Sequence, residues 1–252
     1  MVEALQTGTR EWSDHSENCI LGCSNDCRYC YAKANAIRFG REAADTWKVE
    51  HPNYNRKPAK HKGVTMFPTS HDLHMEHVEW WGQYLIKLLE KGNKVLIVSK
   101  PEYKAISAIC DQFYQSSYQD QIEFRFTIGT NDDTVAAYWE PGAPSPSERL
   151  LSIAKTTTLG FKTSISMEPL MMEDPKPVID ILLIPYVKGE IWIGTMNHYQ
   201  LNPEVPEEAR QIKIQSKENI ERVYNSLKDN PRIRWKDSIQ KMLGIDKFGV
   251  KI

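Results

Sequence analysis

The sequence lacks an excess of charge of either sign, because its 252 residues carry 32 Lys and Arg against 33 Asp and Glu, a net charge of -1. Such a chain has no overall field that attracts nucleic acid or an anionic membrane, so any nucleic-acid contact must be a local patch. No apolar run approaches the roughly 20 residues that span a bilayer, and the opening MVEALQTGTREW lacks the basic and apolar regions of a signal peptide. We therefore expect a cytoplasmic protein.

No internal repeat, low-complexity tract or shift in composition divides the chain. With 40% hydrophobic residues it is long enough to bury one substantial core, so a single domain is expected. A secreted disulfide framework is also missing, because four of the five cysteines fall between positions 19 and 30. In a reducing compartment, such a cluster indicates metal or redox chemistry.

What the sequence does contain is an alternation of short strand-like apolar runs with stretches of helical periodicity, which predicts an α/β fold. The clearest strands are 64–70, 95–99, 122–130, 162–167 and 190–195, and the helical stretches are 77–90, 102–114, 146–159 and 217–227. Strands joined by helix-length crossovers are parallel neighbours, in a barrel or an open doubly wound sheet. The segment PRIRWKDSIQKML offers a last strand and helix.

The helix predicted over 146–159 has the best-marked start. Ser145 stands at the N-cap, Pro146 at the first helical position and Glu148 at the third, which together predict a capping box.

The four clustered cysteines are Cys19, Cys23, Cys27 and Cys30, in the segment NCILGCSNDCRYCYA. Thiolates at such short spacing on one loop can converge on one centre, and cysteine is the usual ligand of iron-sulfur clusters. The last three have the spacing C-x3-C-x2-C, with Tyr29 just before the final cysteine. Three thiolates leave one iron of a 4Fe-4S cube open, and an open iron can bind a substrate.

A structural zinc site and a set of inert buried thiols are the alternatives. Zinc sites usually join two close pairs of ligands across a longer loop and use four ligands, which fits this spacing less well. Cys19 is one ligand more than the cluster needs, so it is a packed thiol, a hydrogen-atom donor or an alternative ligand, and packing is the commonest role. Cys110, in a helical stretch, is expected in the core.

The spacing of Cys23, Cys27 and Cys30 is similar to the signature of the radical S-adenosylmethionine superfamily. From Cys19 to about Asn197 the chain resembles the spore photoproduct lyase and DNA-repair-photolyase-like branch, in CRYCYA, PTSHD, LIVSK and FRFTIGTNDDTVAAYWEPGAPSPSERL. It also resembles a phage-associated radical family in REWSD, VSKPE and ISMEPL. The resemblance implies a partial (β/α)6-type parallel barrel in one domain over 1–252, with a core at about 17–200 and a C-terminal extension at 201–252.

The resemblance also implies the cofactors and their residues. Cys23, Cys27 and Cys30 would ligate a 4Fe-4S cluster, which reduces S-adenosylmethionine to a 5′-deoxyadenosyl radical that abstracts hydrogen from a substrate. Tyr29 would lie beside the adenine. The other implied cofactor-binding residues end predicted strands, where parallel α/β sheets place their ligands: Ser70, His71, Asp72, Lys100, Thr127, Thr130 and Glu168. No catalytic residue is assigned.

Several of these residues have plainer interpretations. His71, His74 and His77 recur at a spacing of three, which suits a metal set or a helix N-terminus with His71 and Asp72 as capping or surface groups. Lys100, followed by proline, suits an anionic carboxylate or merely ends a strand. The plainer interpretation of Glu140 and Pro141 is that they only shape a turn before the following capping box.

One position departs from the pattern of spore photoproduct lyase. In that enzyme a cysteine just before the Thr-Ser pair of the second strand returns a hydrogen atom to the product, whereas Pro68 stands at the corresponding position here. Proline cannot donate a hydrogen atom. Another radical transformation is therefore expected.

The leading hypothesis is a radical enzyme that acts on a nucleic-acid or nucleotide-derived substrate. A donor such as flavodoxin or ferredoxin is expected to reduce its cluster, and no membrane is expected as a partner. Supporting it, segment 45–62 is basic and aromatic, through Trp47, His51, Tyr54, Arg56, Lys57, Lys60, His61 and Lys62. That long segment suits a functional loop or lid, and equally a solvated surface excursion. The alternatives are a peptide or small-molecule substrate, or a non-catalytic zinc-stabilised binding protein.

Overall fold

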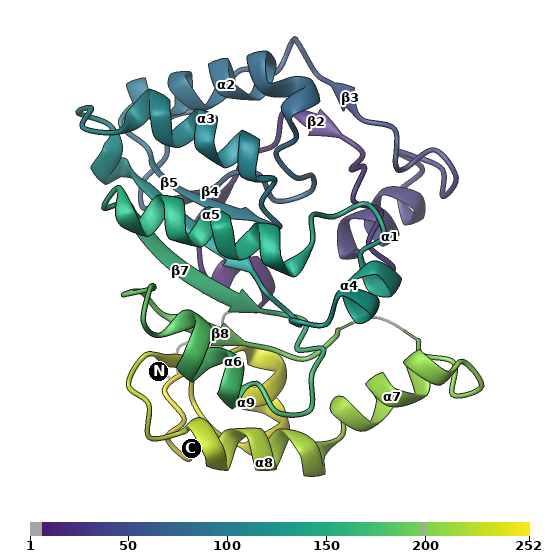
Figure 1. The fold of residues 1–252 in the computed structure, drawn as a ribbon. Coiled ribbons are helices and arrows are strands. Elements are labelled where there is room, and N and C mark those ends of the chain that lie inside the picture. Colours follow the sequence, from purple (N-terminus) through teal and green to yellow (C-terminus); the bar gives the residue numbers. More distant parts are fainter. Residues whose placement is uncertain (1–6, 198–199) are drawn as a thin grey trace.

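A seven-stranded parallel sheet is the framework of the chain in the computed structural model, which describes residues 7–197 and 200–252 (Figure 1). Its strands, in spatial order, are β1 (His15–Ser16), β4 (Val64–Met66), β5 (Lys94–Ser99), β6 (Ile122–Thr127), β7 (Lys162–Met167), β8 (Ile191–Ile193) and β9 (Ile233–Trp235). Every neighbouring pair is parallel, so all seven carboxyl ends meet at one edge. The sheet curls into a half-barrel, which confirms the expected α/β class and partial barrel.

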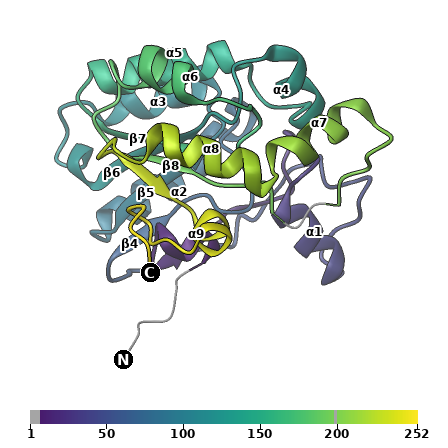
Figure 2. The same ribbon diagram turned by 90° about the horizontal axis from the view of Figure 1, so that it is seen from below.

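Helices connect and cover these strands. They are α1 (Tyr31–Arg38), α2 (Val78–Glu90), α3 (Tyr103–Phe113), α4 (Asp133–Trp139), α5 (Pro146–Thr158), α6 (Lys176–Val178), α7 (Pro206–Ile214), α8 (Lys217–Leu227) and α9 (Asp237–Leu243). Helices α3 and α5 lie side by side outside the sheet, as Figure 2 shows from below. A separate antiparallel pair, β2 (Ile20–Leu21) and β3 (His51–Pro52), lies beside the cysteine loop.

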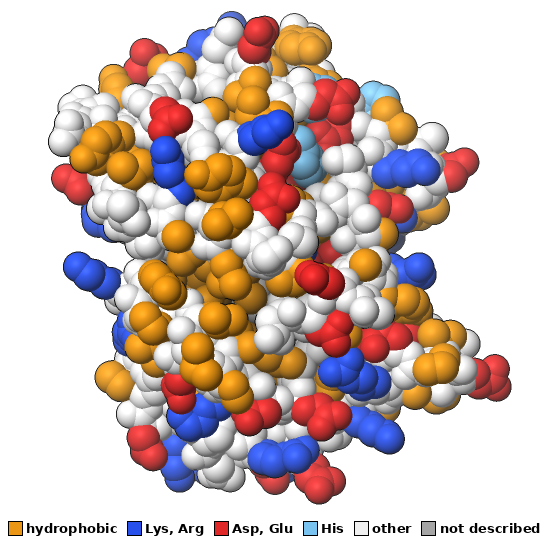
Figure 3. All heavy atoms as spheres, viewed as in Figure 1, with side chains coloured by type: hydrophobic (Ala, Val, Ile, Leu, Met, Phe, Trp, Pro, Cys, Tyr) orange, Lys and Arg blue, Asp and Glu red, His pale blue; other side chains and the backbone are white. Residues whose placement is uncertain are grey.

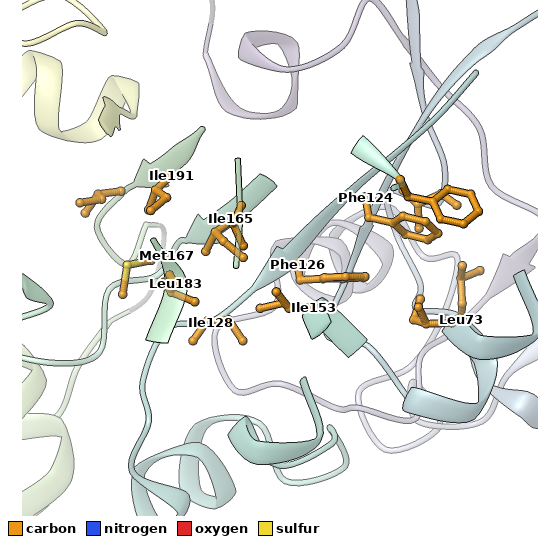
Figure 4. Close-up of a cluster of buried hydrophobic side chains, with 14 of the residues drawn as sticks. Leu73, Phe124, Phe126, Ile128, Ile153, Ile165, Met167, Leu183 and Ile191 are labelled. Carbon is orange, nitrogen blue, oxygen red and sulfur yellow. The ribbon is translucent and has the colours of Figure 1, made fainter. Parts of the chain in front are cut away.

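Alternation along the central strands separates the two faces of the sheet. Phe124 and Phe126 of β6 are fully buried beneath the helices, and Ile165 of β7 and Ile153 of α5 join them in one apolar core (Figure 4). Between the two phenylalanines, Arg125 occupies the opposite, concave face. The apolar residues on the convex face therefore fix which side of the sheet the helices cover.

The concave face is polar and aromatic. The Nε of Arg125 donates to Ser164 Oγ at 3.0 Å, and its guanidinium lies over the rings of Trp12, at 5.0 Å, and Trp192, at 5.4 Å. The two indoles meet edge to face with centroids 6.0 Å apart. Trp12 directly follows the short 3-10 helix Gly8–Glu11. The segment before β1 therefore fills the inside of the half-barrel.

Most predicted elements are present, with shifted ends. Strand β7 and helix α8 have the predicted bounds, and the last strand and helix are β9 and α9. Strand β4 ends at Met66 instead of residue 70, because Pro68 has no N–H with which to continue the ladder. Helices α1, α4 and α7 were not predicted, since they are short and their apolar periodicity is weak.

The predicted capping box at α5 is half formed. Ser145 Oγ accepts from the Glu148 backbone N–H at 3.3 Å, as expected of an N-cap. The Glu148 carboxylate, however, accepts from the Tyr103 N–H at 2.9 Å instead of returning to Ser145. Glu148 therefore joins the start of α3 to that of α5.

The surface carries both signs of charge. In Figure 3, acidic and basic side chains are interspersed over the face that shows α3, α5 and α8, in keeping with the net charge of -1. Over the described ranges, no helix is both long and apolar enough to cross a membrane.

Truncating the core between β7 and the helices should destabilise the protein. We expect Ile165→Ala to lower the free energy of unfolding by about 2–5 kcal/mol, because Ile165 is fully buried and its loss leaves a cavity. Leu151→Ala on α5, where the side chain is 58% exposed, should change it by no more than about 0.5 kcal/mol. Urea unfolding of both variants measures this, and equal losses would contradict the assigned core.

Candidate cofactor site at the carboxyl ends of the strands

The cysteine loop makes two consecutive tight turns in front of the sheet. The Asp26 N–H donates to Cys23 O at 3.2 Å, and the Cys30 N–H donates to Cys27 O at 3.1 Å. Asp26 adopts φ +41°, a left-handed conformation that Asp tolerates in turns. All three thiols are free, with Cys23 and Cys27 buried and Cys30 half-buried. The neighbouring Cys27 contributes to a raised pKa of Cys23, and Cys30 contributes to a raised pKa of Cys27, each after the larger effect of burial.

A small separate core supports this loop. Cys23 packs with Ala32 and Ala36 of α1 and with Trp47, which is buried. The Cys23 N–H donates to Trp47 O at 2.9 Å. At Gly22, with φ +90°, a Cβ atom would lie 2.2 Å from Val49 O, so only glycine allows the chain to pass this close. The segment after α1 thus wraps around the cysteine loop.

The donor set fits a cluster held by three thiolates. Burial raises the pKa of Cys27 to about 12 and the pKa of Cys23 well above its usual range, so without a metal these thiols keep their protons. Bound metal would replace the protons, as it does in cysteine-ligated sites. Across residues 7–197 and 200–252, no group of three or more His, Cys, Asp and Glu side chains is placed to hold a single ion. A cube spreads its thiolates over several irons, so its ligands need not converge on one point.

Cys19 and Cys110 lie apart from this set. Both are free, buried and part of the main apolar core. The backbone of Cys19 accepts from Trp80 Nε1 at 3.0 Å and from the Asn53 N–H at 2.9 Å, so this residue is tied into the scaffold. The packed-thiol interpretation of both cysteines is the one that their burial favours.

Asp72 joins the cysteine loop to the end of β5. Its Oδ2 accepts from Asn25 Nδ2 at 3.0 Å and from the Lys100 N–H at 2.9 Å, and its Oδ1 accepts from Ser99 Oγ at 2.5 Å. Both oxygens are therefore engaged with protein, and Asp72 is buried. In this arrangement Asp72 fixes neighbouring residues that face the site.

His71 is likewise held by protein groups. Its Nδ1 donates to Asp72 O at 2.8 Å, and its Nε2 accepts from the Cys19 N–H at 3.3 Å. Burial lowers the pKa of His71 to about 4, so the ring is neutral at pH 7. Next to it, Ser70 is half-buried, and the Ser70 N–H donates to Asn18 Oδ1 at 2.8 Å, so its backbone is fixed beside the site.

The three histidines do not come together as a metal set in the described structure. His74 Nδ1 lies 2.6 Å from a Glu50 carboxylate oxygen, and His77 Nε2 lies 3.5 Å from the other. His77 makes no side-chain cap at the start of α2, and Asp72 lies too far upstream to cap that helix. Glu50 also accepts from the Ser24 N–H at 2.8 Å, so these groups clasp the cysteine loop.

Glu140 is the centre of the charged network beside Cys27. Its carboxylate pairs with Arg149 Nη2 at 2.5 Å, lies 4.0 Å from Lys100 Nζ and accepts from the Tyr29 hydroxyl. Lys100 Nζ lies 5.4 Å from the Tyr29 ring centroid. Glu140 and Arg149 are each 1% exposed, so the charges are met almost entirely by protein. Tyr29 and Lys100, both predicted site residues, are thus brought together.

The turn after Glu140 packs directly on the cysteine loop. The Gly142 N–H donates to Asn25 O at 3.1 Å, and a Cβ at Gly142 would lie 2.0 Å from Ser24 O. Glu140 and Arg149 were not assigned as site residues from the sequence. The signal that points to them is the E-P-G turn followed by the Arg-Leu pair, which is part of the resemblance to the lyase branch.

The remaining predicted residues lie along the same edge. Thr127 O accepts from Arg149 Nη1 at 3.2 Å, and Thr130 Oγ1 accepts from the Asp132 N–H at 3.1 Å before α4. Glu168 directly follows β7, and burial raises its pKa. Its Oε2 lies 3.5 Å from Lys236 Nζ, which sequence reasoning did not identify because 68 residues separate the two.

Lys236 also ties the two ends of the sheet together. Its buried Nζ pairs with Glu11 Oε2 at 2.6 Å and donates to Gly8 O at 2.7 Å. Glu11 Oε1 accepts from the Asp237 N–H at 3.0 Å. The wall of the site beyond Glu168 is therefore built from residues near both ends of the described chain.

Segment 45–62 is pinned to the body of the protein. Glu17, 2% exposed, accepts from the Ala59 N–H at 3.1 Å and pairs with His61 Nε2 at 2.8 Å and Arg56 Nη2 at 3.2 Å. Trp47 is buried, so it offers no surface for stacking, whereas Tyr54 is 70% exposed. Some aromatic and basic residues of this segment therefore pack against the protein, whereas others lie on the surface.

Comparisons with known proteins agree with this fold. No family model matches the chain. An uncharacterized protein of Acidianus two-tailed virus is 24% identical over 190 residues, covering 66% of this chain and 60% of the viral protein. A spore photoproduct lyase mutant with bound AdoMet and dinucleoside spore photoproduct has a TM-score of 0.52 at 17% identity, covering 85% of this chain and 64% of that one.

A second lyase mutant, with dinucleoside spore photoproduct, also has a TM-score of 0.52, at 14% identity, and covers 92% of this chain and 79% of that one. These likenesses confirm, at the level of fold, the resemblance to spore photoproduct lyase. The chain spans less than two thirds of the length of the viral relative and of the first lyase structure.

Breaking the buried Glu140–Arg149 pair should cost far more than breaking an exposed pair on the same helix. We expect Arg149→Met to lower the free energy of unfolding by about 3–5 kcal/mol, because it leaves a buried carboxylate without its main partner. Lys155→Met, which removes a solvent-screened pair with Asp111, should cost much less. Denaturant unfolding distinguishes them, and similar costs would contradict the proposed role of the buried pair.

Because of His71, the free energy of unfolding of the metal-free protein should increase as the pH rises from about 4 to about 6.5. In that window the unfolded chain binds a proton that the buried ring does not, so acid favours unfolding. The full effect amounts to about 3 kcal/mol, because each tenfold difference in proton affinity between the two states is worth about 1.4 kcal/mol. Unfolding free energies of wild type and His71→Gln across this range measure it, and identical pH slopes would refute it.

Proposed function

We propose that the chain is a radical S-adenosylmethionine enzyme whose 4Fe-4S cluster is ligated by Cys23, Cys27 and Cys30. The observation that carries the proposal is the position of three free thiols on one loop, at the carboxyl-terminal edge of a parallel half-barrel. Ligands of parallel α/β sheets bind at this edge. We take all 252 residues as one radical S-adenosylmethionine domain located in the cytoplasm.

When bound, the cluster and S-adenosylmethionine would supply reductive cleavage of the sulfonium and hydrogen abstraction from the substrate. The protein residues bind and orient. Tyr29, held by Glu140, would lie beside the adenine, and Lys100 would meet the cofactor carboxylate. Ser70, Thr127, Thr130 and Glu168 line the neighbouring strand ends, while His71 and Asp72 hold that edge in place through their backbone contacts.

For the substrate, we propose a nucleic acid or nucleotide derivative. Support comes from the fold shared with spore photoproduct lyase, whose structures contain a dinucleoside spore photoproduct. Pro68 stands where the resemblance places a hydrogen-donating cysteine, so the reaction differs from repair of that lesion. A donor such as flavodoxin or ferredoxin would reduce the cluster. The alternatives are a peptide or small-molecule substrate and a zinc-stabilised binding protein without catalysis.

The ligand assignment predicts a cysteine-dependent cleavage. After anaerobic reconstitution, dithionite and S-adenosylmethionine should give 5′-deoxyadenosine with wild type and at least about 100-fold less with Cys27→Ala, because the cluster loses one of its three thiolates. Cys110→Ala, which removes an equally buried free thiol from α3, should retain the activity. Quantified 5′-deoxyadenosine, with iron and zinc content, is the measurement.

Equal product from wild type and Cys27→Ala would refute the ligand set. About one zinc per chain without iron after anaerobic purification would instead support the zinc-stabilised alternative.

A further inference from the structure

The exposed face of α1 begins at the cofactor site. Tyr31, Asn35 and Arg38 follow the spacing that places residues on one side of a helix, and all three are exposed. The Tyr31 hydroxyl donates to Thr69 O, next to Ser70 in the loop after β4. The N-cap of α1 is Cys30 itself, whose Sγ accepts from the Lys33 N–H at 3.3 Å. This face therefore leads outward from the proposed cluster.

An aromatic platform flanked by cations stands at the far end of α1. Phe39 is 64% exposed, and the guanidinium carbons of Arg38 and Arg41 each lie 5.5 Å from its ring centroid. Gly40, with φ +61°, turns the chain so that Arg41 returns beside the ring. Within the described residues, neither guanidinium forms an ion pair or a hydrogen bond to a carboxylate.

Charge is concentrated in this part of an almost neutral chain. Residues 26–62 contain nine Lys and Arg and four Asp and Glu, a net charge of +5 in a protein of net charge -1. Two of the four acids are met by partners within the segment, Asp26 by Lys33 at 2.7 Å and Glu42 by His51 at 3.9 Å. Outside the segment, Glu17 pairs with Arg56 at 3.2 Å. The remaining excess of cations favours an anionic partner in this part of the protein.

We propose that the exposed face of α1, with the Arg38–Phe39–Arg41 platform, binds a single strand of nucleic acid and directs it to the cofactor site. Unpaired bases stack on exposed aromatic rings, while cations beside the ring meet the adjacent phosphates. The inference rests on the proposed function, because it supplies the polymer to which the reacting nucleotide belongs. Figure 1 shows α1 and the chain after it to one side of the sheet, beside the cysteine loop.

A membrane surface is the competing anionic partner, and α1 fits it less well. Interfacial helices bury a broad apolar face, whereas the exposed side of α1 carries tyrosine, asparagine and arginine, with Ile37, 41% exposed, as its single large aliphatic side chain. One exposed ring between two guanidinium groups suits a stacked base better than an acyl layer. The chemistry of this surface therefore favours nucleic acid.

The test measures the affinity of the reconstituted full-length protein for fluorescein-labelled oligothymidylate by anisotropy over a range of salt concentrations. Phe39→Ala should weaken binding about tenfold, and Phe39→Trp should restore it, because stacking on an aromatic ring is lost and regained. The double variant Arg38→Ala/Arg41→Ala should reduce the slope of log affinity against log salt by about 1.4, at about 0.7 for each lost phosphate contact.

Two matched controls remove similar groups elsewhere. Phe248, 53% exposed, also lies beside two cations, Arg234 at 4.9 Å and Lys247 at 5.2 Å, so Phe248→Ala tests the loss of a similar surface ring near the C-terminal end. Lys87→Ala/Lys91→Ala on and after α2 removes two exposed cations and changes the net charge equally. Both controls should leave affinity and salt slope unchanged.

Equal losses in the control and α1 variants would overturn the proposed surface, as would tight binding to phosphatidylglycerol vesicles with none to the oligonucleotide. Cleavage of S-adenosylmethionine without oligonucleotide binding would also refute the surface and leave the cofactor chemistry standing. Oligonucleotide binding that needs Phe39, in a protein that makes no 5′-deoxyadenosine, would support the surface and refute the enzyme.

Discussion

The buried carboxylate of Glu140 is the interaction on which the arrangement of the site depends. A charge taken out of water is costly unless ion pairs and hydrogen bonds surround it. Glu140 obtains these from three places: Arg149 on α5, Lys100 at the end of β5 and Tyr29 on the cysteine loop. Satisfying one charge thus fixes a helix, a strand end and the cysteine loop relative to one another. Together with the contacts of Trp47 and Glu50, this carboxylate holds the cysteine loop in front of the sheet.

The main elements of the fold follow from local pattern. Strand β7 and helix α8 have their predicted bounds, because alternating and helical periodicities are strong there and are bounded by clear turn residues. The cysteine spacing is also local, so it could be recognised without a structure. Glu168 and Lys236 show the limit, since 68 residues separate them and no periodicity relates them. The polar contacts that define His71 likewise depend on tertiary packing alone.

Segment 45–62 shows why composition does not identify a binding surface. Arg56 and His61 look like free cationic groups in the sequence, but a buried Glu17 holds both of them. Trp47 looks available for stacking, yet it forms the small core behind Cys23. Conversely, Phe39 and its two arginines lie outside this segment, at the C-terminal end of a helix that periodicity did not reveal and just after it. Whether a charged or aromatic side chain can bind a ligand depends on its partners in the folded protein, and the sequence does not reveal these partners.

The contact between Glu11 and Lys236 has a consequence for the order in which the protein is made. Glu11 and Trp12 emerge early from the ribosome, but Lys236 and the Asp237 backbone, which hold them, are translated more than 220 residues later. Until then Glu11 lacks the ammonium group and the backbone N–H that hold it in the folded protein. Pairings so distant in sequence slow folding, and partly closed sheets expose edges that aggregate. Nascent chains halted before residue 236 should therefore depend on chaperones more than the finished protein does.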